Sequence, residues 1–192
     1  MRAEVASRAP HARKHGTTFA ETWTSADGAT IVAVGAVIAG VDPIVVSDLL
    51  RTGARAVVTS RKALATALGA LDRVVQRHAK EHRDDTLAAS VVLFAFASNA
   101  VDVDVAGAGR LHAVVIDGSG AQQPLHGRAG ALGTGIELTD LVQHIHLRRD
   151  DLLVAATVPV EPAWWNAGDR TAEALLHRSG SHDASVALIA AG

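Results

Sequence analysis

The sequence predicts an α+β fold in which helices pack on one face of an antiparallel sheet. Three observations predict it. The elements run in the order two strands, two helices and then a series of strands. Ala and Val are abundant while aromatic residues make up only 3% of the chain, so helices and strands can approach each other closely. No internal repeat or linker is evident, and 192 residues are enough for one domain with its own core.

The N-terminal segment, residues 1–16, is set apart from this domain, which we expect to span residues 17–192. It contains six Arg, Lys and His side chains with little periodicity. A tail or a first edge strand is the favoured interpretation, and a basic docking arm is the alternative.

The first regular elements are a hairpin and two helices. Residues 18–24 and 29–35 read as strands joined by the turn Ser25–Gly28. Asp42 followed by Pro43 has the pattern of a helix N-cap with proline at the first helical position. Apolar residues then recur at helical spacing, which predicts helices over residues 43–58 and 62–82.

The remaining chain is rich in strand-like runs separated by glycine-containing turns. Asp102 and Asp104 alternate with valines, and His144 and His146 alternate around Ile145, as expected of half-solvated strands. The spacing of the two histidines can also ligate a metal, but a solvent-facing strand is the favoured interpretation. The predicted strands cover residues 86–97, 101–106, 111–117, 143–147, 152–160 and 184–190, with a short helix over 172–178.

Composition excludes several classes of function. The formal net charge is −2, so no global field favours nucleic acid. The chain has no cysteine, which excludes disulfides and thiolate metal sites. The apolar runs are too short to cross a bilayer, and no secretion signal is evident near Met1. We therefore expect a cytoplasmic protein that binds neither nucleic acid nor membrane.

The order of elements and their turn motifs resemble the PPM (metal-dependent) serine/threonine phosphatases, most closely the compact bacterial branch typified by the stage II sporulation protein E phosphatase. The resemblance runs from Gly16 to the end of the chain. The segments that carry it are Gly16–Glu21, Val32–Val37, Gly107–His112, Ala131–Gly133, Leu147–Thr157 and His182–Val186. It implies an α-β-β-α sandwich, in which two antiparallel sheets are flanked by helices.

The resemblance also implies a metal chemistry whose ligands are changed in this chain. In the family, aspartates at the sheet edges hold two Mg²⁺ or Mn²⁺ ions, and a bridging water attacks phosphoserine or phosphothreonine. Hard cations need oxygen ligands, and two close cations need anionic ones. Thr18, Ala36, Val158 and His182 occupy the aspartate positions. The resemblance therefore implies a pseudophosphatase without a metal cofactor, which binds proteins instead of hydrolysing phosphoesters.

The sequence leaves two other functions open. An active phosphatase could use a site rearranged around Glu21, Asp42, His182 and Asp183, and this alternative alone calls for Mg²⁺ or Mn²⁺. A small-molecule binder could use the vacated apolar cleft near Ala36 and Val158.

A protein partner fits the first interpretation best. Relatives of this branch act in bacterial partner-switching signalling, so the expected partner is a signalling regulator or a second copy of the chain. Trp164 and Trp165 are candidate anchors, since tryptophan is enriched at interface hot spots, although packing against the core is the favoured interpretation. His78 and His82, four residues apart on a helix, lack the His-Glu-x-x-His order of a zinc protease and predict a solvated face.

Overall fold

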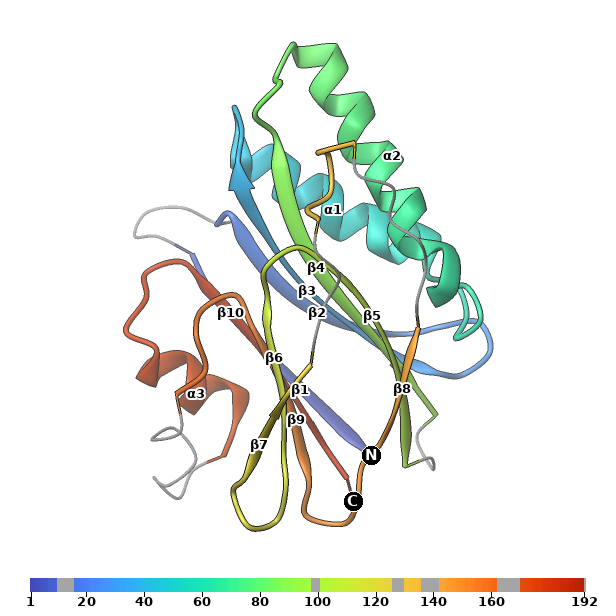
Figure 1. Ribbon diagram of the computed structural model, residues 1–192, viewed down its shortest axis with the longest axis vertical. Coiled ribbons are helices and arrows are strands. Elements are labelled where there is room, and N and C mark those ends of the chain that lie inside the picture. The colour runs from blue at the N-terminus through green and yellow to red at the C-terminus, as the bar shows by residue number, and fades with distance from the viewer. Residues whose placement is uncertain (10–15, 98–100, 126–129, 136–141, 162–169, 192) are drawn as a thin grey trace.

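The computed structural model describes residues 1–9, 16–97, 101–125, 130–135, 142–161 and 170–191. Its described elements form two five-stranded sheets packed face to face, with helices on the outer face of each (Figure 1). Every strand pair in both sheets is antiparallel. The predicted α+β sandwich is thus confirmed.

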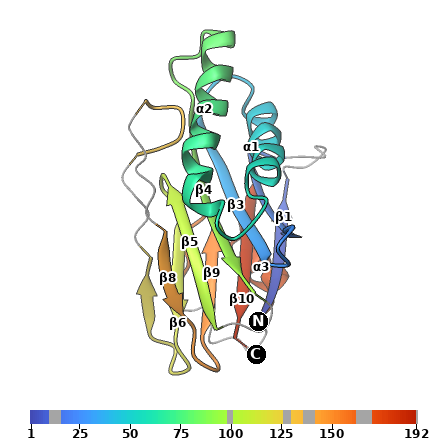
Figure 2. The same cartoon turned by 90° about the vertical axis from the view of Figure 1, so that its right-hand side faces the viewer.

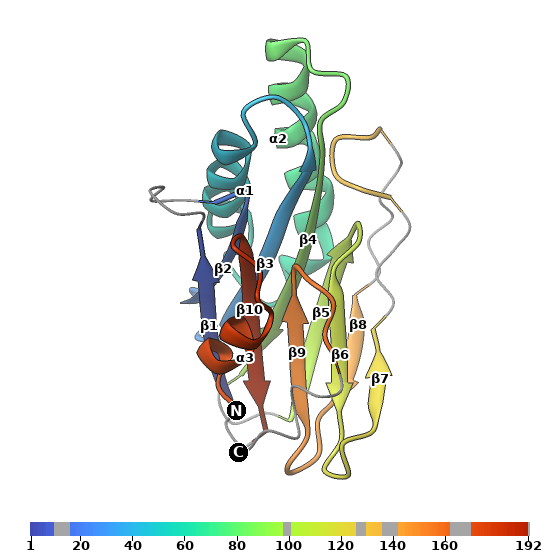
Figure 3. The same cartoon turned by 90° about the vertical axis from the view of Figure 1, so that its left-hand side faces the viewer.

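Sheet A joins the two ends of the chain. Its strand order is β1-β10-β9-β6-β7, so the first strand lies beside the last (Figure 3). Its members are β1 (Arg2–Arg8), β10 (Ala184–Ala190), β9 (Leu152–Ala156), β6 (His112–Ile116) and β7 (Gln122–Pro124). The short helix α3 (Ala172–Arg178) covers the outer face beside β1 and β10.

Sheet B carries the two longer helices. Its order is β2-β3-β4-β5-β8, and α1 and α2 lie together over its outer face (Figure 2). The strands are β2 (Thr18–Thr24), β3 (Thr30–Ala39), β4 (Ala88–Phe96), β5 (Asp102–Ala108) and β8 (Gln143–His146), and the helices are α1 (Pro43–Val57) and α2 (Leu64–His82).

The core has three layers because each sheet buries both faces. Leu50 of α1 and Leu71 of α2 pack with Ile31 and Leu93 on the outer face of sheet B. The central strands of the two sheets pack against each other through a second apolar cluster. A third apolar cluster lies between α3 and the outer face of sheet A. Apolar residues at consecutive strand positions, such as 31–34 in β3, follow from this burial on both faces.

Two predictions from the sequence are wrong in detail. Asp42 does not cap α1 with its side chain: it adopts a left-handed conformation (φ 54°, ψ 53°), and its backbone carbonyl accepts from Val45 N and Val46 N instead. The strand expected over residues 152–160 ends at Ala156. The next residue, Thr157, bonds to Ser185 of β10 through both its backbone N–H and its hydroxyl oxygen. None of the helices in the described parts of the chain is long and apolar enough to cross a membrane.

Candidate functional site

The positions expected to hold metal aspartates gather only in part, at one end of the sandwich. Thr18 begins β2 and pairs in register with Ala36 of β3. Both lie on the face of sheet B that looks toward sheet A, since Val32 and Val34, in the same alternation as Ala36, belong to the cluster between the sheets. A phosphatase of this fold would present carboxylates here, and this chain presents a hydroxyl and a methyl group.

A hydrogen-bonded group of side chains fills this end of the sandwich. Thr18 Oγ1 donates to Asp183 Oδ1 at 2.9 Å and lies 3.0 Å from Ser185 Oγ. Ser185 Oγ in turn lies 2.8 Å from Ser7 Oγ, and Ser7 Oγ accepts from Ala20 N of β2 at 2.9 Å. We call Ser7, Thr17, Thr18, Asp183 and Ser185 the hydroxyl cluster. It joins β1 and β10 of sheet A to β2 of sheet B.

Asp183 is the only carboxylate of the hydroxyl cluster, and its two oxygens already have partners. Oδ2 accepts from Thr17 N and Thr17 Oγ1, each at 2.8 Å, and Oδ1 accepts from Thr18 Oγ1. Gly16 passes so close that a Cβ there would lie 2.9 Å from Asp183 Cγ. The carboxylate therefore acts as a structural acceptor that fastens the start of β2 to the turn before β10.

Val158 and His182 are not members of the hydroxyl cluster. Val158 packs against the apolar cluster beneath α3, on the opposite face of sheet A from the cluster between the sheets. His182 is exposed at the turn that precedes β10. An isopropyl group in an apolar layer has no donor atom for a cation, so the side chain at position 158 contributes nothing to metal binding.

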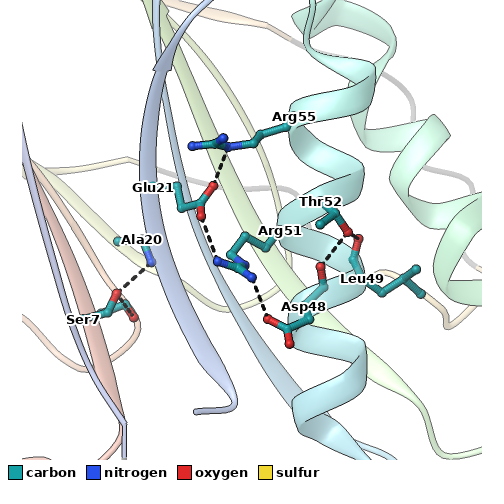
Figure 4. A network of polar contacts seen from close by, with 9 residues as sticks. Ser7, Ala20, Glu21, Asp48, Leu49, Arg51, Thr52 and Arg55 are labelled. Atoms are coloured by element: carbon teal, nitrogen blue, oxygen red, sulfur yellow. Dashed lines mark hydrogen bonds and ion pairs between the residues drawn. The ribbon is translucent and has the colours of Figure 1, made fainter. Parts of the chain in front are cut away.

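The residues named for the alternative, rearranged phosphatase site do not lie on one face of the protein. Glu21 points to the outer face of sheet B, where its carboxylate accepts from Arg51 Nη1 at 3.1 Å and Arg55 Nε at 2.8 Å (Figure 4). Arg51 also contacts Asp48 at 3.1 Å. Asp42 is exposed at the start of α1. Glu21 thus ties β2 to α1 and faces away from Asp183.

The donor set does not fit the binuclear Mg²⁺ or Mn²⁺ centre of the fold family. Two adjacent divalent cations need several carboxylate oxygens, and the hydroxyl cluster offers one carboxylate that is already hydrogen-bonded. Within the described segments, no group of three or more His, Asp or Glu side chains is placed to hold a metal. We therefore derive no catalytic step through metal ions.

A small pocket opens beside the hydroxyl cluster. Its volume is about 160 Å³, and Thr18, Ser7, Glu21 and Arg51 contribute to its lining. Ligand cavities commonly span roughly 300–1,000 Å³. This pocket is not the predicted apolar cleft, because neither Ala36 nor Val158 lines it. A larger groove of about 560 Å³ lies at the other edge of the sandwich, between β7 and β8.

A second polar group lies on the outer face of sheet B, and sequence reasoning underestimated it. Asp104 and Asp102 of β5 pair across the strands with His144 and His146 of β8. Each Asp shares a hydrogen bond with the Nδ1 of its His, at 2.6 Å and 2.9 Å respectively. The signal was present in the sequence as two alternating pairs, but only the register shows that they face each other.

Arg61 joins this second group from the connection between α1 and α2. Its guanidinium donates to both oxygens of Asp104. Burial opposes ionisation of Asp104, but hydrogen bonds and charges from Arg61 and His144 outweigh it and lower the pKa of this carboxyl below its ordinary value of 3.8. The same contact raises the pKa of Arg61. Ionised Asp104 of β5 thus bonds both to the edge strand β8, through His144, and to the connection between α1 and α2, through Arg61.

Trp164 and Trp165 lie outside the described residues, so their proposed role as anchors stays a prediction.

Comparison with known structures shows the same fold in bacterial regulators and phosphatases. An S. agalactiae serine/threonine phosphatase superposes with a TM-score of 0.80 at 10% identity, covering 100% of this chain and 99% of that one. A chain from a study of the bacterial stressosome gives a TM-score of 0.73 at 16% identity, with 97% and 98% covered. The RsbU and RsbW domains of Rv1364c from Mycobacterium tuberculosis give 0.70 at 18% identity, with 97% of this chain and 60% of that one covered.

Sequence comparison gives the family. A search of curated proteins finds no match, but the model of the stage II sporulation protein E (SpoIIE) family matches residues 26–182. This stretch includes α1, α2 and α3 and ends one residue before Asp183. The chain therefore belongs to the stage II sporulation protein E family and has the fold of the PPM phosphatases.

Proposed function

We propose that this chain is a pseudophosphatase: it keeps the phosphatase fold, lacks metal-dependent hydrolysis and acts as a protein-binding module in regulatory signalling. The observation that carries the proposal is the hydroxyl cluster. Thr18 stands at one of the positions where the family places anionic ligands, and its hydroxyl bonds to Asp183 and contacts Ser185, which contacts Ser7. These bonds join sheet A to sheet B.

The chemistry of the donor set supports inactivity. Neutral hydroxyls do not balance the charge of two divalent cations, and bringing such ions into a partly buried site without anionic ligands is strongly unfavourable. Binding an ion at Asp183 would also break the bonds from Thr17 and Thr18 that close this end of the sandwich. An active site rearranged around Glu21 is disfavoured for a geometric reason, since Glu21 faces α1 through Arg51 and Arg55.

A role in protein binding is supported by exposed apolar side chains between β3 and α1. Where β3 leads into α1, three large apolar side chains are exposed: Ile38 by 54%, Val41 by 61% and Val45 by 55%. Clustered exposed apolar side chains are typical of protein contact sites. The structural likeness to a stressosome chain and to the RsbU and RsbW domains makes a regulatory protein partner, in a partner-switching pathway, the most economical proposal.

Phosphoester hydrolysis tests the proposal. The chelator-treated protein is assayed with p-nitrophenyl phosphate and with a phosphoserine peptide, with added Mn²⁺ or Mg²⁺. The Asp183→Asn variant is the matched control, because a contaminating phosphatase would be unaffected by this substitution. We expect equal background rates in both samples. Metal-dependent turnover by the wild-type chain that disappears in Asp183→Asn would show an active phosphatase and overturn the proposal.

A further inference from the structure

The two histidines of β8 are held in an arrangement that the proposed function does not use. His144 Nδ1 lies 2.6 Å from Asp104 Oδ1, and His146 Nδ1 lies 2.9 Å from Asp102 Oδ1. Each carboxylate sits on β5 directly opposite its histidine in the strand register. Both imidazoles are therefore bound at the same ring nitrogen by a group on the same neighbouring strand.

This bonding fixes which nitrogen is available to a ligand. A carboxylate accepts hydrogen bonds, so the proton of each neutral imidazole lies on Nδ1 and the lone pair lies on Nε2. Histidines that bind metals commonly donate their other ring N–H to a carboxylate, which fixes the tautomer and increases the basicity of the coordinating nitrogen. Asp102 and Asp104 take that supporting position here.

The histidines also share one accessible face. They are two residues apart on a strand, which places them on the same side at a spacing of about 7 Å along the chain. Their side chains are 76% and 63% exposed, so an ion can reach both rings from solvent. Among the described strands, β8 pairs only with β5, which leaves it at the edge of sheet B.

We propose that His144 and His146 form a two-histidine chelate for a borderline divalent transition metal of the Zn²⁺ type, bound through both Nε2 atoms. Water completes the coordination shell, because the described residues bring no group of three metal-binding side chains together. Imidazole favours Zn²⁺ and its neighbours over Mg²⁺. The site lies on the outer face of sheet B and is independent of the hydroxyl cluster and of the proposed function.

The chain contains its own control for this arrangement. His78 and His82 of α2 are four residues apart, with their rings stacked at a centroid distance of 4.0 Å. His82 Nδ1 contacts the backbone oxygen of His78 at 3.0 Å, in place of the carboxylate that each histidine of β8 contacts. This pair therefore has the proximity of a chelate, but His82 Nδ1 contacts a backbone oxygen where each histidine of β8 contacts a carboxylate.

Calorimetric titration of the 192-residue, chelator-treated protein with Zn²⁺ alone tests the proposal, with wild type, H144A/H146A and H78A/H82A compared at pH 7.5. We expect saturable binding in wild type and in H78A/H82A, weakened at least tenfold in H144A/H146A, as loss of ligands or of their supporting groups commonly costs about 10- to 100-fold in affinity. Equal affinity in H144A/H146A, or loss in H78A/H82A only, would overturn the assignment.

A second variant tests the supporting acids. Asp102 is 58% exposed and its carboxylate contacts His146 at the edge of the sheet, so we expect Asp102→Asn to leave the fold intact. This variant should bind Zn²⁺ more weakly, and the Nε2 resonances of both histidines should shift with Zn²⁺ in long-range ¹H–¹⁵N spectra of wild type. Unshifted Nε2 resonances would overturn the chelate even if Zn²⁺ bound elsewhere. Neither result depends on phosphatase activity.

Discussion

Thr18 Oγ1 donates a hydrogen bond to Asp183 Oδ1 at 2.9 Å, across 165 residues of chain. This bond joins the first residue of β2 to the turn before β10, where the family would bind metal ions. Asp183 thus acts as a structural acceptor for Thr17 and Thr18, and stability measurements can test this role.

Asp183→Ala is expected to lower the free energy of unfolding by about 1–3 kcal/mol, because it leaves Thr17 N and both threonine hydroxyls without their acceptor. Urea unfolding measures the loss. Asp85→Ala, at an exposed position, is the control and should change stability little. A stability equal to wild type in Asp183→Ala would mean that the carboxylate is not a structural acceptor.

Gly109→Ala tests the close packing of the turn after β5 against Ser90 of β4. Gly109 has φ +84°, and a Cβ there would lie 2.7 Å from Ser90 Cβ and 2.9 Å from Ser90 Cα. Gly120 has nearly the same backbone angle, φ +88°, with nothing within 4 Å of its Cβ position. Both alanines bear the strain of a positive φ, so only the clash distinguishes them. We expect Gly109→Ala to lower the melting temperature clearly more than Gly120→Ala, and equal shifts would contradict the packing.

Glu21→Gln weakens the contact between β2 and α1. Arg51 and Arg55 are 32% and 55% exposed, so water and salt screen much of their attraction to Glu21. We expect a loss of no more than about 1 kcal/mol at low salt that shrinks as NaCl is added. Chemical unfolding at two salt concentrations measures it. Asp48→Asn, which removes a more exposed partner of Arg51, should have the smaller effect.

Asp104→Asn is expected to reduce the loss of folding stability as the pH falls in the acid range. The folded-state pKa of Asp104 is lowered from 3.8 because Arg61 and His144 outweigh the effect of burial. The unfolded chain therefore binds the proton first as pH falls. The contribution is fully present above the unfolded pKa and is lost as pH falls through the folded one. Thermal unfolding between pH 2 and pH 6 tests this, and an unchanged pH slope in the variant would contradict it.

Much of the fold could be predicted from sequence because apolar periodicity directly reflects burial. The predicted bounds of β2, α3 and β10 coincide with those of the structure. β7 was missed because Gln122–Pro124 is short, polar and ends in proline, so it carries no alternation. It forms because the turn after β6 brings it back beside that strand.

The candidate site could be predicted only as a set of positions whose residue types differ from those of the family it resembles. The change of residue type at Ala36 and Val158 is visible in the sequence. Contacts such as Ser185 with Ser7, separated by 178 residues, depend on the strand order and on which edges meet. The same limit applies to Asp104 and His144, whose alternating patterns were recognised separately but whose pairing depends on the register of β5 and β8.

The central claim is that the hydroxyl cluster replaces the metal centre, and calorimetric titration with Mn²⁺ and Mg²⁺ tests it most directly. The measurement uses metal-stripped H144A/H146A protein, so that binding at β8 does not contribute. We predict no saturable heat with either ion, and no change in melting temperature. Tight, saturable binding that is lost when Asp183→Asn is added would contradict the account. It would indicate that the chain is an active phosphatase.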